Sequence, residues 1–167
     1  SGTAPEIASL HPMAVDVTDA GQVTEAFAQL RNDQLLPDVA FLAAGATAAS
    51  PALHQRSDQF ERVLAVNVVG AFNVAREALR GMVRKGFGRI VLVSSINTRI
   101  HSAGGVAYNA SKAAVEEMGR CLAGEARIGD VTVNTLGLSL VAGGHGRGLD
   151  GGRSSAQGRA ANEDRAD

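Results

Sequence analysis

The sequence predicts an α/β fold with a doubly wound parallel sheet, and three observations support this prediction. Strand-like and helix-like segments alternate along most of the chain. Two apolar runs, residues 39–45 and 88–95, are typical of strands that are buried on both faces of a parallel sheet. The composition, with 45% hydrophobic and 20% charged residues in 167, is that of a globular protein with a sizeable core.

The first third of the chain predicts a strand, a helix and a second strand. Residues 13–17 form a short β-like run, and Thr18 or Asp19 is placed to cap a helix over residues 20–31. The apolar face of this helix carries Val23, Phe27 and Leu30. The strand over 39–45 follows and is closed by Gly45.

The central segment, residues 57–86, predicts two helices or one bent helix. Ser57 is a cap signal at its start, and Gly86 is a plausible end. Asn67 is a polar amide inside an otherwise apolar run, and it marks the expected bend together with Gly70.

The last elements lie between residues 88 and 140. They are a strand over 88–95, a polar loop over 96–105, a helix over 107–127 and a strand over 130–140. The residues expected on the buried face of the helix are Ala114, Val115, Met118, Cys121 and Leu122. Glu116 and Glu117 are interpreted as a solvated face of the same helix. Right-handed crossovers bring the carboxyl ends of all these strands to one edge, where active sites of such folds lie.

Residues 1–141 are assigned to one domain, and residues 142–167 to a disordered C-terminal tail. From Gly143 onward the composition is dominated by Gly, Arg, Ala, Ser and Asp, and Leu149 is the one large aliphatic residue. Such a segment buries too little apolar surface to offset the entropy of ordering.

Charge and composition argue against several classes of function. The net charge of −1, without a dense basic run, does not favour a nucleic-acid partner. A single cysteine cannot form an internal disulfide, and no apolar segment approaches the length of a membrane span, so we expect a soluble, cytoplasmic protein. The histidines are too scattered to predict a metal site.

The stretch with the most chemical content is residues 104–119. It contains the only tyrosine, Tyr108, and Lys112 lies four positions later, one helical turn away. By itself this spacing is also found in pairs of solvent-exposed helix residues without a function, and Lys112 with Glu116 can be a weak surface ion pair. The interpretation changes because Ser95 ends the preceding strand, at the edge where the helix begins.

A proton-transfer site needs this combination of side chains. A lysine cation one turn away stabilises a phenolate, which lets a phenol exchange protons with an alcohol or carbonyl. A serine hydroxyl beside it can hold the substrate oxygen. For Asn67, a capping or backbone-bonding role at the helix bend remains the alternative to a functional one.

These motifs resemble the short-chain dehydrogenase/reductase family. "YNASK" (108–112) follows "IVLVSS" (90–95), with "NVVG" (67–70) upstream, and the similarity runs from about Met13 to Leu136. The resemblance implies a Rossmann-like fold and hydride transfer between NAD or NADP and a small carbonyl or alcohol substrate. It also implies a homo-oligomer built through the helices at 57–85 and 107–127.

The resemblance also implies a role for each matching residue. Tyr108 would be the catalytic acid/base, Lys112 would hold the nicotinamide ribose, and Ser95 would bind the substrate oxygen. Asn67 would hold a water of the proton relay. The adenine pocket and the turn beneath the cofactor would be lined by Asp16, Val17, Ala44 and Gly45.

The sequence departs from the family pattern in three places. The opening strand and its glycine-rich turn, which presents backbone N–H groups to the pyrophosphate, are not found. After "VNTL" (133–136) the family's Pro-Gly turn and substrate segment are replaced by the tail, which is what a shifted reading frame would produce. Ala43 and Ala44 stand where the family carries asparagine.

Two hypotheses follow from the sequence. The first is an oxidoreductase of this type, present as an incomplete copy. The second is a non-catalytic fragment or interaction module that uses the two long helices. The serine, asparagine, tyrosine and lysine favour the first hypothesis, and the missing glycine-rich turn favours the second.

Overall fold

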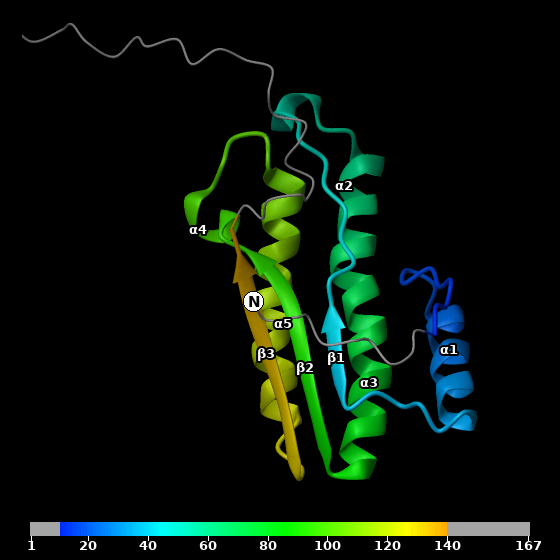
Figure 1. The fold of residues 1–167 in the computed structure, drawn as a ribbon. Helices are drawn as coiled ribbons and strands as arrows, with labels where there is room; N and C mark the ends of the chain where they lie inside the picture. The colour runs from blue at the N-terminus through cyan, green and yellow to red at the C-terminus, as the bar shows by residue number, and fades with distance from the viewer. Residues whose placement is uncertain (1–10, 140–167) are drawn as a thin grey trace, which may run out of the picture.

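A three-stranded parallel sheet forms the centre of the molecule, in a computed structural model that describes residues 11–139. The strands are β1 (Val39–Leu42), β2 (Phe87–Ser95) and β3 (Asp130–Leu138), in the order β1-β2-β3 (Figure 1). The register pairs Leu42 with Leu92 and Ser95 with Leu138. The expected parallel α/β architecture is therefore confirmed, and all three strands end at the same edge.

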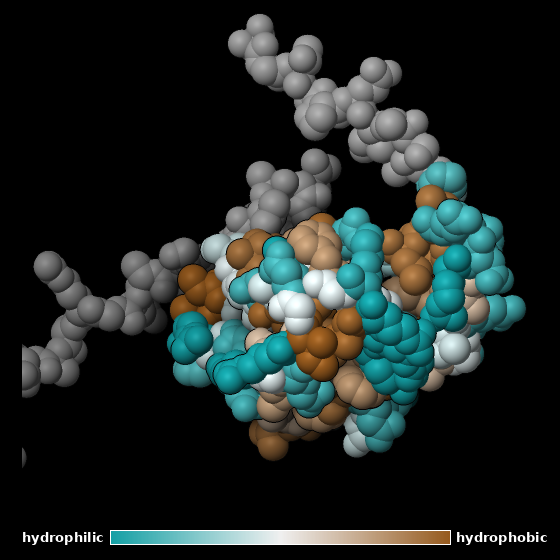
Figure 2. Space-filling view, turned by 90° about the horizontal axis from the view of Figure 1, so that it is seen from below, coloured by the Kyte–Doolittle hydropathy of each residue, from teal (hydrophilic) through white to brown (hydrophobic). Residues whose placement is uncertain are grey.

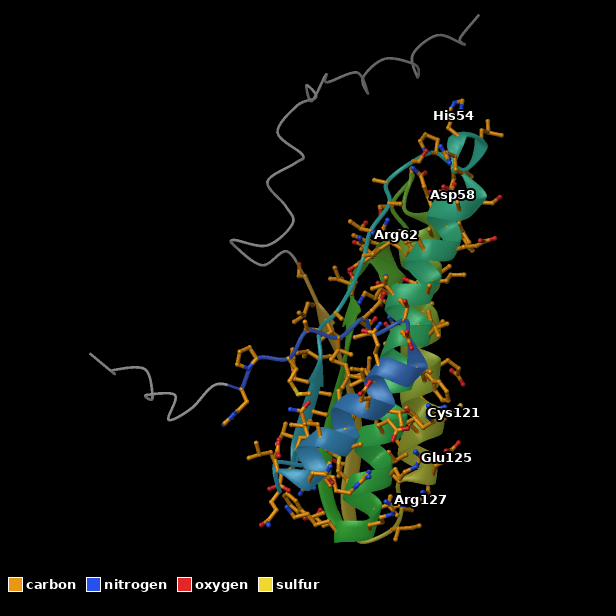
Figure 3. All side chains as sticks on the ribbon, turned by 90° about the vertical axis from the view of Figure 1, so that its right-hand side faces the viewer. His54, Asp58, Arg62, Cys121, Glu125 and Arg127 are labelled. Carbon is orange, nitrogen blue, oxygen red and sulfur yellow. The ribbon has the colours of Figure 1, made fainter. Side chains whose placement is uncertain are left out.

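Three long helices accompany the sheet. They are α1 (Ala20–Asn32), α3 (Ala71–Lys85) and α5 (Val106–Glu125). Helices α3 and α5 pack against the strands, and α1 packs against α3 (Figures 1 and 3). The core between them is built from Met82, Ile90, Leu92, Val115 and Leu122. No helix in the described part of the chain is long and apolar enough to cross a bilayer.

The predicted bend near Asn67 is a change of helix type. Helix α2 (Ser57–Leu64) continues into η2 (Ala65–Gly70), a π-helical turn, and then into α3 without a break. π-helical turns inside α-helices occur frequently at functional sites. The predicted end of this segment is confirmed, since Gly86 adopts a left-handed conformation with φ 76°.

One predicted strand is wrong. Residues 13–17 pair with no strand of the sheet described here. Val15 instead packs against the hydrophobic core, and the carbonyl of Val17 accepts a hydrogen bond from Asn73 Nδ2 at 3.0 Å. Val15 and Val17 are thus held by contacts outside the sheet and not by a strand partner.

The strand predicted at 39–45 is shorter and less buried than expected. Strand β1 ends at Leu42, and one of its faces is exposed, with Val39 at 60% and Phe41 at 57%. In residues 11–139 the packed helices lie on the other face of the sheet, so the continuous apolar run is not covered on both sides. Figure 2 shows apolar groups among hydrophilic ones at the end where the strands begin.

Of the two predicted helix caps, the structure confirms the one at the start of α1 and not the one at the start of α2. Asp19 caps α1, accepting from the N–H groups of Gly21 and Gln22. Ser57 does not cap α2, because it is the first helical residue and Arg56 occupies the cap position without a side-chain bond. The loop expected at 96–105 contains a short helix, α4 (Asn97–Ile100).

The burial predicted for Cys121 is also wrong. Helix α5 does bury Val115 and Leu122, but Cys121 is exposed, beside Glu125 on the outer side of the helix (Figure 3). The predicted tail, 142–167, and the domain boundary at 141 lie outside the described residues.

Candidate functional site

The predicted catalytic residues come from three elements that meet near the carboxyl edge of the sheet. Ser95 is the last residue of β2, Tyr108 and Lys112 lie in the first two turns of α5, and Asn67 lies in η2. Helix α5 packs against β2 and also against η2, which brings these residues to one region.

Lys112 is buried and points back along β2. Its residue is 5% exposed, and its Nζ donates a hydrogen bond to the carbonyl oxygen of Val93 at 2.8 Å. Burial lowers the pKa of the Lys112 ammonium from its usual value, because the charged form loses solvation. The same nitrogen lies 5.7 Å from the centre of the Tyr108 ring, so a cation stands against the face of the phenol.

The side-chain amide of Asn67 connects the loop that follows β1 to helix α5. It is 1% exposed, its Oδ1 accepts from the N–H of Ala46 at 2.6 Å, and its Nδ2 donates to the Ala46 carbonyl at 2.9 Å. The second Nδ2 hydrogen goes to Ser111 Oγ at 2.8 Å. Asn67 thus bonds to backbone, but its partner is Ala46 in the loop after β1 and not the helix bend that the alternative named.

Ser111 is a residue that the sequence reasoning missed. It is fully buried, and its hydroxyl donates to the carbonyl oxygen of Tyr108 at 2.7 Å while it accepts from Asn67. The hydroxyl thereby connects the π-helical turn to the first turn of α5. The available signal was a serine on the buried face of the helix, three residues after the tyrosine.

Ser95 is held at the point where β2 gives way to α4. Its Oγ accepts from the N–H of Asn97 at 3.2 Å, and its carbonyl oxygen lies 2.9 Å from the Thr98 hydroxyl, whose one hydrogen it shares with Glu116 Oε1. A groove of about 500 Å³ between α4, α5 and β3 has Ser95 in its lining, together with Glu116. Neither Tyr108 nor Lys112 lines this groove, so it is not by itself a closed site around the phenol.

Glu116 is not part of the solvated face that the sequence predicts for it. Its side chain is 17% exposed, and Oε1 accepts hydrogen bonds from Thr98 Oγ1 at 2.8 Å and Ser94 Oγ at 2.9 Å. These two bonds, first that from Thr98 and then that from Ser94, lower the pKa of the Glu116 carboxyl, with Arg99 and Arg120 adding smaller effects. The exposed residue of the pair is Glu117, which forms an ion pair with Arg120.

The residues expected beside a cofactor lie on two connecting segments. Ala44 and Gly45 are exposed in the segment after β1, as is Ala43. A Cβ placed on Gly45 would lie 3.5 Å from Asn67 Oδ1 and 3.8 Å from Lys112 Nζ, so this glycine approaches the buried polar groups closely.

Asp16 and Val17 precede α1. Asp16 is exposed, and its Oδ1 accepts from the hydroxyl and the N–H of Thr18, at 2.8 and 2.9 Å, which lowers the pKa of the carboxyl. Val17 packs against Gly70 in η2, where an added Cβ would lie 3.2 Å from Val17 Cβ. The packing of Val17 brings this segment beside the turn that carries Asn67.

In residues 11–139 no group of three or more His, Cys, Asp or Glu side chains is arranged to hold a metal. His54 and Cys121 lie far apart along the molecule (Figure 3). His101 is the residue after α4 and has a left-handed backbone, φ 49°.

Comparisons with known proteins identify relatives over most of the chain. A family model described as short chain dehydrogenase matches residues 3–149. The 3-oxoacyl-[acyl-carrier-protein] reductase MabA of Mycobacterium tuberculosis is 35% identical over 121 residues, which is 72% of this chain and 49% of that protein. The chloroplastic NADPH-dependent aldehyde reductase 2 of Arabidopsis thaliana is 34% identical over 145 residues, 82% of this chain and 53% of the relative.

Solved structures agree with the sequence relatives. A crystal structure of NAD+-bound xylitol dehydrogenase is similar with a TM-score of 0.72 and 30% identity, over 75% of this chain and 48% of that one. The chain spans about half the length of the curated relatives it matches.

Proposed function

Because this chain belongs to the short-chain dehydrogenase/reductase family, we propose that it transfers a hydride between a nicotinamide cofactor and a small carbonyl or alcohol substrate. The observation that carries the proposal is the pairing of a buried lysine with the only tyrosine, with Nζ 5.7 Å from the ring centre. The cofactor is NAD or NADP, since relatives are named for, or bound to, either one.

The residues at this edge fit the sugar of a nucleotide. Lys112 donates one ammonium hydrogen to the carbonyl of Val93 and has two more to donate. Gly45 leaves the approach to this ammonium open, because a side chain there would lie within 3.8 Å of Nζ. We assign the ribose hydroxyls to Lys112 and Tyr108, with Ala44 and Gly45 beside the bound sugar.

The adenine end of the cofactor is assigned to Asp16 and Val17. Their segment is fixed beside η2 by Val17, whose carbonyl is bonded to Asn73 and whose side chain packs on Gly70. The exposed carboxylate of Asp16, held by Thr18, is a hydrogen-bond acceptor for an amino group.

The bound cofactor supplies or accepts the hydride, and the chain's own residues handle the proton. Tyr108 gives its phenolic proton to the substrate oxygen during reduction and takes it back during oxidation. The Lys112 cation stabilises the phenolate that remains, and the Ser95 hydroxyl donates a hydrogen bond to the substrate oxygen. Both Nδ2 hydrogens of Asn67 are used, so a relay water at this residue would bind through one of its oxygens.

A binding titration tests the proposal and has a matched control in the chain itself. The chain has no tryptophan, so NADH or NADPH fluorescence is observed without that background. We expect binding at millimolar concentration or tighter, lost in Lys112→Met and kept in Lys85→Met, the only other lysine, which pairs with Asp38 at the surface. Tyr108→Phe should bind the cofactor and abolish turnover. Absence of binding at any practical concentration would contradict the proposal.

The competing hypothesis is a non-catalytic association module, and a feature of η2 and α3 favours association in either case. Val69 and Phe72 are 49% and 42% exposed on these helices. We propose that α2–α3 and α5, predicted as helices 57–85 and 107–127, pair with a second copy of the chain. Sedimentation velocity should show a dimer or larger species that Phe72→Asp reduces to a monomer, and a wild-type monomer would refute the pairing.

A further inference from the structure

One carboxylate oxygen joins both flanks of Ser95 to the helix that carries the tyrosine. Oε1 of Glu116 accepts from the hydroxyl of Ser94, the residue before Ser95, at 2.9 Å, and from that of Thr98, three residues after it, at 2.8 Å. Glu116 lies on α5, one turn beyond Lys112. Ser95 itself has no such bond to α5 among those described, so its place relative to that helix depends on its neighbours.

We propose that Glu116 is a positioning residue, whose Oε1 fixes the Ser95 hydroxyl relative to Tyr108. The inference rests on the proposed function for the role of Ser95 toward substrate. Its structural part, that Glu116 holds the β2–α4 junction, can be tested without turnover.

The acceptor oxygen, rather than the negative charge, carries this role. Both hydroxyls bond to Oε1, while Oε2 faces Arg99 at 3.4 Å and Arg120 at 3.8 Å. The arginine side chains are 74% and 62% exposed, and exposed ion pairs contribute little. A glutamine at 116 can present the same oxygen to Ser94 and Thr98, whereas a methionine of similar length cannot.

Loss of Glu116 should leave the fold intact, because both hydroxyls have a second acceptor. Ser94 Oγ lies 3.3 Å from the Lys112 carbonyl and Thr98 Oγ1 lies 2.9 Å from the Ser95 carbonyl, so the one hydrogen of each hydroxyl can turn to these oxygens when Glu116 is removed. The effect should therefore be local to the junction.

Amide hydrogen exchange measured by NMR tests the inference. The reporter is the N–H of Asn97, which donates to Ser95 Oγ at 3.2 Å. In Glu116→Met we expect this amide to exchange about tenfold faster, because two hydroxyls lose the acceptor on α5 and only partly regain one from a carbonyl, while the Leu92 amide in the core is unchanged. Glu116→Gln should restore protection to within about threefold of the wild type, and Glu117→Gln, one position along, should have no effect.

Thr98→Val provides a second measurement, and because the Thr98 hydroxyl is also in reach of the Ser95 carbonyl, its effect is compared in the wild-type and Glu116→Met backgrounds, where it should be smaller in the second. It should also raise Asn97 exchange. Unchanged Asn97 exchange in Glu116→Met and Thr98→Val, equal loss in the glutamine and methionine variants, or a uniform change of all amides would overturn the inference.

The kinetic consequence separates this inference from the proposed function. If the chain turns over substrate, Glu116→Met should lower kcat about tenfold without changing the affinity for the cofactor, and glutamine should restore it. If the exchange results are as expected but no variant and no wild type shows turnover, the junction role stands and the proposed function fails.

Discussion

Removal of the Ser111 hydroxyl tests how much stability comes from the buried hydrogen bonds that join Asn67, Ser111 and the Tyr108 carbonyl. In Ser111→Ala, one Nδ2 hydrogen of Asn67 loses its acceptor in a place where both residues are almost wholly buried. A buried donor left without a partner costs about 1–3 kcal/mol. The carbonyl of Tyr108 loses an added bond, but it lies inside α5 and keeps its helical partner, so we expect destabilisation of about 2 kcal/mol, mostly from Asn67.

Urea denaturation followed by far-ultraviolet circular dichroism measures this cost. The midpoint should fall while the slope of the unfolding free energy with urea stays unchanged, since the exposed surface on unfolding is the same. Ser102→Ala, an exposed serine in the α4–α5 connection, serves as the control and should change the free energy by less than about 0.5 kcal/mol.

A double-mutant cycle identifies the origin of the cost. In an Asn67→Leu background no amide hydrogen is left without an acceptor, so the further change Ser111→Ala should lower the free energy of unfolding much less than it does in the wild type. Equal cost in both backgrounds, or a loss below about 0.5 kcal/mol in the single variant, would refute the reasoning that these two side chains act as one unit.

Three other predictions follow from burial and charge. Two hydroxyl hydrogen bonds lower the pKa of Glu116 in the folded protein. The stability that this carboxylate contributes is therefore present above the ordinary glutamate pKa of 4.5 and is lost as the pH falls below it. Below that pH, urea midpoints should fall less steeply in Glu116→Gln than in the wild type or in the control Glu117→Gln. Burial lowers the pKa of Lys112, so the unfolded chain binds the lysine proton more tightly than the folded one does. The free energy of unfolding of the wild type should therefore increase as the pH approaches 10.5, and this increase should be absent in Lys112→Met. Gly70→Ala would place a Cβ 2.6 Å from a methyl group of Val17, and differential scanning calorimetry should show destabilisation of about 1–3 kcal/mol, whereas an unchanged melting temperature would show that this segment moves freely.

Much of the architecture was predictable because local patterns fixed it. The apolar run at 88–95 forms β2, the cap at Asp19 starts α1, and the polar break at Asn67 marks the π-helical turn. Each of these signals depends on residues within a few positions of one another. The strand expected at 13–17 failed because a strand exists only through its neighbour, and no pattern within the segment states which partner it has.

The errors within α5 have a different cause. Cys121 is next to Leu122, and a step of one residue rotates a helix by about 100°, so the apolar stripe can include one and exclude the other. Glu116 is covered by residues 94–98, about twenty positions earlier, which helical periodicity cannot anticipate. The tyrosine and lysine could be found from their spacing, but the two residues that hold their surroundings, Ser111 and Glu116, are recognised only from contacts between elements.

The polar contacts divide the molecule into two parts with different means of support. At the end where the strands begin and along their middle, apolar side chains such as Met82, Ile90 and Val115 pack the helices onto the sheet. At the carboxyl edge the helix α5 is held by hydrogen bonds, from Lys112 to the Val93 carbonyl and from Asn67 to Ser111. Directional bonds of this kind fix orientation more than they add stability, since a neutral one contributes only about 1 kcal/mol net and one from a charged group about 1.5–3 kcal/mol. Substitutions at this edge should therefore displace the side chains proposed to act in catalysis before they unfold the protein, whereas truncations in the apolar core should do the reverse.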